Sequence, residues 1–537
     1  MRRWNGWGDD SYSYPVKPEA KVFIEQLLGR AKPLPEASLA SVLAKVPASR
    51  LPEHPLVSLA AEDRLRHARG QSLPDWLAMR SGEFGVFPDG VAFPTTGEEV
   101  RSLLSFARQQ NILVIPYGGG TSVVGHITPA AGERPVLTID MGRMNQLLDL
   151  DEKSLLATFG AGVAGPELEA QLRARGYTLG HFPQSFELST LGGWVASRSS
   201  GQQSMRYGRI EQMFAGGTLE TPQGTLTIPT FPASSAGPDL REMILGSEGR
   251  MGILTEVKVR VLPLPERESF HVAFLPNWQC AQQLVRQIVQ GKQQLSMLRL
   301  SNAVETSTQL VLSGHPKSVK LLESYLSLRG AGEGKCMLTY GVTGSRAQCK
   351  ATLRQTSRMI RRAGGVLTGT LLGKKWQHSR FRSPYLRETL WELGYVVDTL
   401  ETATDWPNVD RMVAAVEGAL QQAAEGTPVH MFTHLSHIYP QGSSIYTTYL
   451  FPMAASYEAT LSRWQLFKNT ASEAVIAHRG TISHQHGVGA DHAPYLLPEK
   501  GELAVGAIDR LCHYFDPQQH MNIGKLLPSS ESGEGTP

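Results

Sequence analysis

The stretch VIPYGGGTSVVG, residues 114–125, is the part of the sequence that decides the fold. The apolar run 112–115 predicts a strand, and three consecutive glycines, 118–120, follow it. Because glycine has no Cβ, such a turn lets backbone N–H groups approach an anion closely, and the hydroxyls of Thr121 and Ser122 add donors. The loop therefore predicts a phosphate or diphosphate site. It matches neither GxGxxG nor GxxxxGK[ST], so it indicates a nucleotide site of another kind.

The composition is that of an ordinary globular protein with room for two or three cores. Of the 537 residues, 41% are hydrophobic and 19% are charged, and the formal net charge of +3 is too small to indicate a nucleic-acid partner. Four cysteines without CxxC spacing indicate a reducing compartment, with neither disulfides nor a zinc site. No apolar run reaches the ~20 residues that a membrane span needs. We expect a cytoplasmic protein.

Changes in sequence texture divide the chain into five segments. Residues 1–85 contain one short helical pattern and are expected to form an N-terminal helical extension. Residues 86–265 alternate short β-rich runs with short amphipathic helices, whereas 266–470 predict an antiparallel sheet covered by helices. Residues 471–527 form a C-terminal segment that begins with a predicted helix. The composition of residues 528–537 predicts a disordered tail.

Two further glycine-rich elements each lie next to an apolar strand. Residues 189–213 combine glycines with hydroxyl side chains, which gives the close backbone approach and neutral donors that a flat ring system needs along its polar edge. Residues 238–261 contain GSEG before a strand that begins at Ile253. Each element alone is typical of a tight turn. Three of them beside strands indicate one cofactor site.

Together these elements resemble the vanillyl-alcohol oxidase family of FAD-binding proteins. In that family PxGGG-T-S binds the FAD diphosphate, T-x-GG lines the flavin, and GSEGxxGIxTE closes the FAD domain. The terminal pattern DPxxxxNxGK, residues 516–525, also matches. The resemblance implies an α+β fold, with a two-segment FAD-binding domain of the vanillyl-alcohol oxidase/PCMH type and a cap domain between the segments. Residues 471–527 would return to the flavin.

The same resemblance implies which residues hold the cofactor. The third glycine of the loop, Gly120, leaves no histidine there for covalent attachment, so non-covalent FAD is expected. The implied cofactor-binding residues are Pro116, Gly118, Gly119, Gly120, Thr121, Ser122, His181, Ser185, Thr190, Gly193, Trp194, Ser197, Glu248, Gly249, Gly252 and Ile253.

A closer resemblance is to the alkyldihydroxyacetonephosphate synthases. It rests on RWNGWGDD at 3–10, GHFPQSFELSTLGGWVASR at 180–198, IYTTYLF at 445–451 and SHQHGVG at 483–489. Those enzymes use FAD without net oxidation. They exchange the fatty acyl group of acyl-dihydroxyacetonephosphate for a fatty alcohol through a flavin N5 adduct, which gives an ether lipid precursor. The resemblance therefore implies a transferase with a lipid-like small-molecule substrate.

The exchange needs a base that removes a proton from the carbon bearing the ester and an acid that helps the carboxylate leave. Imidazole and phenol side chains can do both when their pKa values are tuned. The resemblance implies that Tyr446 is the acid and that His484 and His486 are the base and its partner. It also implies that Arg299 and Arg387 bind phosphate or shape the active site. Judged alone, such a tyrosine is typical of a core, such histidines of a solvated loop, and such arginines of surface ion pairs.

Three positions depart from the family pattern. Gln485 replaces the central histidine of an H-H-H-G-V-G motif, and an amide cannot accept a proton at neutral pH. Asn302 stands where aspartate is more common, and His434 where the family has arginine. If ether formation requires the missing imidazole, the chain does something else.

Two alternative functions stay open. One is an FAD-linked dehydrogenase or oxidase of a D-2-hydroxy acid such as D-lactate or glycolate, whose relatives bind a metal through HxGDGNxH. This chain has His434 but no GDGN, Tyr446 falls near the second histidine, and nothing in the sequence supplies carboxylates to His434 and His437. We therefore expect no metal. The other alternative is an FAD-binding scaffold or lipid carrier without turnover.

The sequence says less about contacts of the protein surface with membranes or with a second copy of the chain. The basic run 374–387 is either a solvated helix face or a contact with anionic lipid headgroups, as a peripheral membrane protein would have. The sequence leaves homodimer formation open.

Overall fold

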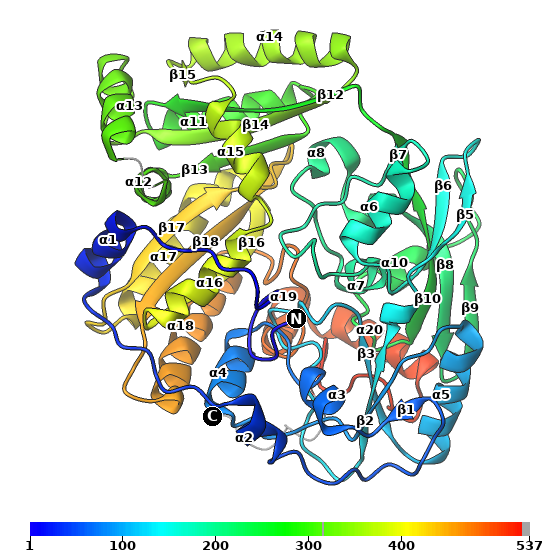
Figure 1. Cartoon of the computed structure of the whole chain (residues 1–537). Helices are drawn as coiled ribbons and strands as arrows, with labels where there is room; N and C mark the ends of the chain where they lie inside the picture. Colours follow the sequence, from blue (N-terminus) through cyan, green and yellow to red (C-terminus); the bar gives the residue numbers. More distant parts are fainter. Residues whose placement is uncertain (314–315, 529–537) are drawn as a thin grey trace.

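The computed structural model describes residues 1–313 and 316–528, so most of the tail predicted at 528–537 lies outside the described residues (Figure 1). Two lobes stand side by side, each built on its own β-sheets. We call residues 57–263 the first lobe and residues 267–477 the second lobe. The N-terminal and C-terminal segments run between them.

The first lobe contains two main sheets. In the four-stranded sheet, with the order β1-β2-β4-β3, strands β2 and β3 both pair with β4 in parallel. The five-stranded sheet, β5-β6-β10-β8-β9, is antiparallel throughout, and β7 pairs with β11 separately. The strands are β1 (Val57–Ser58), β2 (Gly90–Ala92), β3 (Leu113–Tyr117), β4 (Val136–Asp140), β5 (Leu147–Asp151), β6 (Leu156–Gly160), β7 (Tyr177–Thr178), β8 (Phe214–Thr221), β9 (Gly224–Ile228), β10 (Ile253–Arg260) and β11 (Leu262–Pro263).

Helix α5 shows why the first-lobe helices form where they do. Thr96 caps its start by accepting a hydrogen bond from the Glu99 N–H, and its buried residues recur at helical spacing to face the sheets. The helices up to the end of this lobe are α1 (Pro18–Leu28), α2 (Leu39–Leu43), α3 (Ala61–Arg66), α4 (Leu73–Ser81), α5 (Gly97–Gln109), α6 (Gly165–Arg173), α7 (Leu191–Ser197), α8 (Ser204–Tyr207), α9 (Ile210–Met213) and α10 (Leu240–Ile244), with a 3₁₀ turn at Met141–Arg143.

The second lobe is one seven-stranded antiparallel sheet with the order β15-β12-β14-β13-β17-β18-β16. Its register decides which side chains share a face: Tyr446 pairs with Glu401 on one side and with His434 on the other. These three side chains therefore lie in a row on one face of the sheet. The strands are β12 (Arg267–Leu275), β13 (Met297–Ser301), β14 (Cys336–Gly344), β15 (Val366–Leu367), β16 (Tyr395–Asp405), β17 (His430–Leu435) and β18 (Gly442–Pro452).

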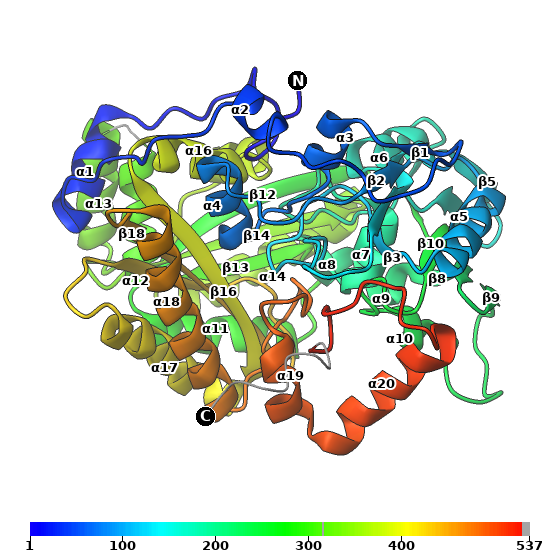
Figure 2. The same cartoon turned by 90° about the horizontal axis from the view of Figure 1, so that it is seen from below.

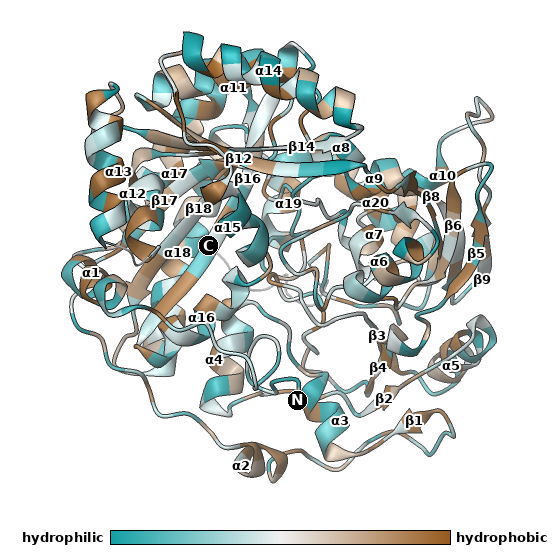
Figure 3. Ribbon diagram, turned by 45° about the horizontal axis from the view of Figure 1, so that its top comes forward, coloured by the Kyte–Doolittle hydropathy of each residue, from teal (hydrophilic) through white to brown (hydrophobic). Residues whose placement is uncertain are grey.

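Helices cover this sheet, as the sequence predicts. Helix α14 buries residues at positions three and four apart, and in Figure 3 it alternates between hydrophilic and apolar colours while apolar residues follow the strands. The remaining helices are α11 (Trp278–Gln290), α12 (Ala303–Leu312), α13 (Pro316–Leu328), α14 (Arg346–Arg362), α15 (Leu371–Ser379), α16 (Ser383–Glu392), α17 (Val409–Ala423), α18 (Tyr457–Ala477), α19 (Ala493–Lys500) and α20 (Glu502–Phe515), with a 3₁₀ turn at Trp406–Asn408.

The C-terminal helices differ from the sequence prediction. A single helix near 470–480 was expected, but α18 begins at Tyr457. Helices α19 and α20 follow it and contribute side chains to the apolar core of the first lobe (Figure 2). Helix α18 contacts α17, α4, α19 and β16, so it has no single apolar stripe by which to recognise its full length. Among the described residues, no helix has the length and apolarity needed to cross a bilayer.

Two segments far from the glycine loop in sequence contact the two lobes near the middle of the molecule. Met521 forms a parallel bridge with Val114, and the Asn522 N–H donates to the Val114 carbonyl, in the strand before the glycine loop. Near the other end of the chain, Trp7 is buried in the core of the second lobe, and its backbone N–H donates to Glu388 on α16. These contacts place residues 521–522 against the first lobe and Trp7 against the second lobe.

Candidate active site

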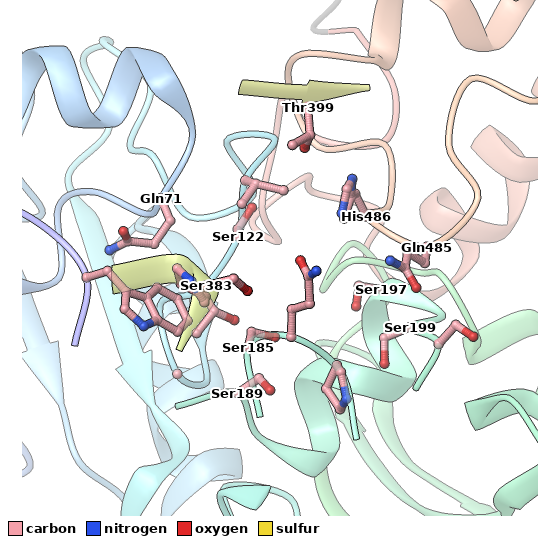
Figure 4. A pocket seen from close by; sticks show the side chains of 18 of the residues that line it. Gln71, Ser122, Ser185, Ser189, Ser197, Ser199, Ser383, Thr399, Gln485 and His486 are labelled. Carbon is pink, nitrogen blue, oxygen red and sulfur yellow. The ribbon is translucent and has the colours of Figure 1, made fainter. Parts of the chain in front are cut away.

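A cavity of about 680 Å³ lies where the two lobes and the C-terminal segment meet. That volume falls within the ~300–1,000 Å³ typical of ligand sites. In Figure 4, side chains from the first lobe, the second lobe and the 483–489 loop converge on one open space. Every residue predicted to bind cofactor or substrate, or to act in catalysis, lines this cavity except His181 and His484.

The glycine loop is packed too closely for side chains. A Cβ on Gly118 would lie 2.3 Å from Thr190 Oγ1, and one on Gly119 would lie 1.8 Å from the Leu188 carbonyl oxygen. Gly120 adopts a φ of 66°, in the left-handed region that glycine tolerates. The loop is therefore held against the residues before α7 while it lines the cavity, as a close-fitting cradle for a diphosphate requires.

Helix α7 brings neutral polar groups to the same cavity. Thr190 caps the helix, Ser197 Oγ donates to the Gly193 carbonyl, and Trp194 Nε1 donates to Ser189 Oγ. Figure 4 shows Ser185, Ser189, Ser197 and Ser199 around the open space. These hydroxyls fit the polar edge of a ring system better than they fit a charged ligand.

His181 lies behind this wall rather than in it. Its Nε2 is 2.7 Å from Ser199 Oγ, its ring packs on Trp194, and its side chain is buried. Burial lowers the His181 pKa to about 3, so the imidazole is neutral. The residue supports the wall through Ser199 and Trp194.

The GSEG turn joins the glycine loop to the histidine loop. The carboxylate of Glu248 accepts hydrogen bonds from the backbone N–H groups of Val488 and Gly489 at 2.5 and 2.7 Å, and His126 Nε2 lies 3.1 Å away. The Glu248 carbonyl accepts from the Asn522 side chain. Glu248 therefore fixes the 483–489 loop beside the cavity, which places His486 there.

Tyr446 occupies the centre of the row on the second-lobe sheet. Its ring stacks on His434 with 4.8 Å between centroids and lies 6.0 Å from the His486 ring. Burial, reinforced by the nearby Glu401 carboxylate, raises the Tyr446 pKa, so the phenol stays protonated.

The two predicted histidines have different surroundings. His486 lines the cavity, and burial lowers its pKa, so the imidazole is neutral near pH 7. His484 lies behind the cavity, where its Nδ1 is 3.1 Å from Glu401 Oε1 and its Nε2 is 2.7 Å from both Tyr439 Oη and Arg209 Nη1. The structure thus brings His486, but not His484, to the site with Tyr446.

Carboxylates do lie beside the histidines, contrary to the sequence expectation. Glu305 is 3.1 Å from His434, and Glu401 groups with His437 and His484 so that their ligand atoms lie within 4.8 Å. Glu305 lies on α12 and Glu401 on β16, both remote in sequence from the histidines that they contact. The sequence alone therefore did not reveal these contacts.

Hydrogen bonds already order the Glu401 group. Because an arginine only donates hydrogen bonds, Arg209 requires an unprotonated Nε2 on His484, which leaves the proton on Nδ1 toward Glu401. The contacts of His484 therefore form a hydrogen-bonded chain from Arg209 to Glu401.

The two predicted arginines also differ. Arg299 Nη2 donates to Glu305 Oε1 at 2.5 Å, so much of its charge is already balanced. Arg387 stacks over Trp76, 4.2 Å from the ring centroid, and its Nη1 donates to the Gln71 carbonyl. Its Nε and Nη2 have no hydrogen-bond partner in the described chain, although both are buried. Arg387 therefore offers unsatisfied donors to an anion in the cavity.

Known proteins match the chain over nearly its full length. A family described as FAD binding domain matches residues 88–228, and one described as FAD linked oxidases, C-terminal domain, matches residues 264–526. The alkyldihydroxyacetonephosphate synthase of Trypanosoma brucei brucei is 30% identical to the chain, with 100% of this chain and 94% of that protein covered. The chain belongs to the alkyldihydroxyacetonephosphate synthase family.

Solved structures agree with this assignment. An alkyldihydroxyacetonephosphate synthase structure, 26% identical, superposes with a TM-score of 0.82 and covers 97% of this chain and 98% of that one. A p-cresol methylhydroxylase, 12% identical, shares the fold alone, with a TM-score of 0.65 over 96% of this chain and 99% of that one. The predicted family, the α+β fold of the vanillyl-alcohol oxidase/PCMH type and an FAD-dependent enzyme are confirmed.

Some cavity residues were not predicted from the sequence. Trp7 lies in the RWNGWGDD stretch, which signalled the family but not a place in the cavity. Gln71 and Trp76 support Arg387 from a segment with no motif. Glu401 does not itself line the cavity, and its place near the site becomes recognisable only from the strand register that sets it beside Tyr446.

Proposed function

We propose that the chain exchanges the acyl group of acyl-dihydroxyacetonephosphate for a fatty alcohol, as the name of its relatives indicates. One observation carries the proposal: a protonated phenol, a neutral imidazole and an unsatisfied guanidinium line the same cavity as the glycine cradle. An acid, a base and an anion anchor are the groups that such an exchange needs.

The residues present fit FAD. The cradle at 118–120, the turn at 246–249 and the hydroxyls around α7 surround one cavity, where a Cβ on either Gly118 or Gly119 would collide with its neighbours. When bound there, FAD supplies a redox-active ring that can hold a substrate carbon. We propose that it is held without a covalent bond, so acid precipitation of the holoenzyme should release all of the flavin into the supernatant.

The acid and base roles follow from protonation states. The raised pKa of Tyr446 keeps a proton available for the departing carboxylate, and the lowered pKa of His486 keeps its imidazole free to accept the proton from the substrate carbon. His484 does not reach the cavity, so we assign it a supporting role behind His486.

Arg387 is proposed to bind the phosphate. Its Nη2 and Nε have no hydrogen-bond partner among the described residues, and stacking on Trp76 fixes the guanidinium plane, so both donors are available to an anion. Arg299, paired with Glu305, is proposed to shape the site beside Tyr446 rather than to carry the phosphate charge.

Apolar residues extend the cavity under the second-lobe sheet. They come from strands β12, β14 and β17 and helices α12 and α15, and such a wall suits a hydrocarbon chain better than it suits a small hydroxy acid. The residues are Val272, Leu310, Leu312, Met337, Leu372 and Phe432.

The test compares the two substrate classes. Flavin-loaded protein is mixed anaerobically with palmitoyl-dihydroxyacetonephosphate and radiolabelled hexadecanol, and separately with D-lactate or glycolate. The proposal expects labelled ether product and stoichiometric release of palmitate, with no oxidised product from the hydroxy acids. Flavin reduction by a hydroxy acid, without ether formation, would establish the dehydrogenase alternative instead.

The substrate also suggests where the protein works. Lys375 and Arg380 of the basic run line the cavity, while Lys374 and Arg382, like Leu371, are exposed. We propose that these exposed residues make a peripheral membrane contact. Co-sedimentation with vesicles containing phosphatidylserine, compared with neutral vesicles, tests the contact, and light scattering tests whether the protein is a homodimer.

A further inference from the structure

Glu401 is a buried carboxylate that the proposed reaction does not yet use. It lies on β16 directly opposite Tyr446, and its side chain has no exposed surface. Three histidines surround it: Oε1 is 3.1 Å from His484 Nδ1 and 3.8 Å from His437 Nδ1, and Oε2 is 3.7 Å from His486 Nε2. Oε2 has no hydrogen-bond partner among the described residues.

Hydrogen-bond chemistry shows which histidines can donate to this carboxylate. His437 Nε2 lies 3.3 Å from the Gly201 carbonyl, which only accepts, so the proton of neutral His437 is on Nε2 and its Nδ1 cannot donate to Glu401. His484 has the opposite tautomer. Its Nε2 accepts a hydrogen bond from Arg209, so its proton is on Nδ1, which donates to Glu401 Oε1.

His484 satisfies one carboxylate oxygen and leaves the other without a donor. A buried carboxylate oxygen without a donor costs free energy, and His486 Nε2 is the imidazole nitrogen nearest to it. A small rotation of the His486 ring would close the 3.7 Å gap to hydrogen-bond length.

We propose that Glu401 is the positioning residue for the base. Its Oε2 holds the Nε2–H of His486, so Nδ1 is the unprotonated nitrogen that receives the proton from the substrate carbon. The carboxylate then balances the charge of the imidazolium, while His484 and Arg209 hold the other oxygen in place. This inference rests on the proposed function, because it assigns His486 the role of base.

Other charges also face His486 and enter any measurement of its titration. Asp398 on β16 raises its pKa as Glu401 does, whereas Lys468 on α18 and the neighbouring His484 lower it. Tyr446 on β18 faces the same ring and stays neutral over the working range. Glu401 is the group proposed to accept the hydrogen bond from His486 Nε2, so its removal changes the partner of that nitrogen.

The variant Glu401→Gln keeps the size of the side chain and removes its charge. Because the Glu401 charge raises the His486 pKa, removing it lowers that pKa further, so the rising limb of the kcat–pH profile moves to lower pH. At pH 7.5, kcat is expected to fall by about 100-fold, with KM and flavin content close to those of the parent protein. A purely structural role would lower flavin content or melting temperature without moving the limb.

Glu417→Gln is the matched control. Glu417 lies on α17, accepts a hydrogen bond from Thr433 on β17 and does not line the cavity. It should leave kcat and the pH profile unchanged. In a protein that already carries His486→Asn, Glu401→Gln should lower kcat little further, because the base that Glu401 positions is already absent.

A second readout does not depend on turnover. Labelling of His486 by diethylpyrocarbonate, followed by mass spectrometry across pH, reports the pKa of the free imidazole. The midpoint should move down in Glu401→Gln and stay in place in Glu417→Gln. Glu401→Asp, whose shorter side chain withdraws the carboxylate from Nε2, should move it down by less, and it serves as the test if the glutamine variant does not fold. An unchanged midpoint in Glu401→Gln would overturn the inference. If the midpoint shifts but the protein forms no ether, the proposed function is wrong, whereas the pairing of Glu401 with His486 is supported.

Discussion

At the residue scale, the site holds ordinary side chains in the protonation states that acid and base catalysis require. Burial pushes the pKa of Tyr446 up and that of His486 down, so at neutral pH the acid keeps its proton and the base lacks one. The rate should therefore rise with pH through the lowered His486 pKa and fall only above the raised Tyr446 pKa. The opposing shifts widen the pH range over which both groups are competent.

Replacing Tyr446 by phenylalanine tests the acid. The ring that stacks on His434 is kept, but the proton for the leaving carboxylate is lost, so kcat should fall by about 100-fold or more while flavin absorbance is retained. Tyr395→Phe is the control, because Tyr395 lies on the same sheet and its hydroxyl donates to the Gly29 carbonyl, away from the cavity. If Tyr446→Phe turned over at the parental rate, another group would have to be the acid.

Replacing Arg387 by lysine tests the phosphate anchor. A point charge cannot stack on Trp76 and present two fixed donors, so KM for the phosphorylated lipid should rise by about 10- to 100-fold, as expected for loss of a hydrogen bond to a charged group. Steady-state kinetics of the exchange measures it. The control is Arg463→Lys, because the Arg463 guanidinium donates to the Pro452 carbonyl and does not line the cavity. An unchanged KM would show that another cationic side chain binds the phosphate.

At the element scale, local motifs were predictable and strand register was not. The strand before the glycine loop and the turns around it followed from apolar runs and glycine spacing, and the structure places them as expected. The contact between Glu401 and Tyr446 depends on how β16 aligns with β18, and no local pattern fixes that alignment. His484 and His486 alternate in one loop, yet only the folded loop decides which of them reaches the cavity.

The glycine loop itself can be tested with one methyl group. Gly119→Ala would place a Cβ 1.8 Å from the Leu188 carbonyl oxygen, a backbone contact that no side-chain rotation can relieve. The loop must shift, so the purified variant should be colourless or bind FAD far more weakly, as absorbance at 450 nm and flavin titration would show. Gly132→Ala is the control, since a Cβ there meets nothing within 4 Å. Normal flavin content in Gly119→Ala would show that the glycine loop does not bind the cofactor.

At the scale of the whole molecule, buried histidines connect the two lobes. His437 follows strand β17 of the second lobe, and its Nε2 faces the Gly201 carbonyl of the first lobe at 3.3 Å. Burial lowers its pKa to about 3, so the folded protein keeps it neutral at a pH where the unfolded chain protonates it. Asp491 acts in the opposite sense, because burial raises its pKa to about 6.

These histidines make stability depend on pH in a predictable direction. Between about pH 6.5 and pH 5, the unfolded chain binds a proton at His437 that the folded protein does not, so the free energy of unfolding falls on acidification by up to about 1.4 kcal/mol per pH unit for that group. His437→Gln keeps a donor toward Gly201 and removes the titration, so its urea-unfolding curve should lose part of that slope. Equal slopes in the parent protein and in His437→Gln would show that His437 titrates alike when folded and unfolded, and that its contact with the first lobe does not hold it neutral.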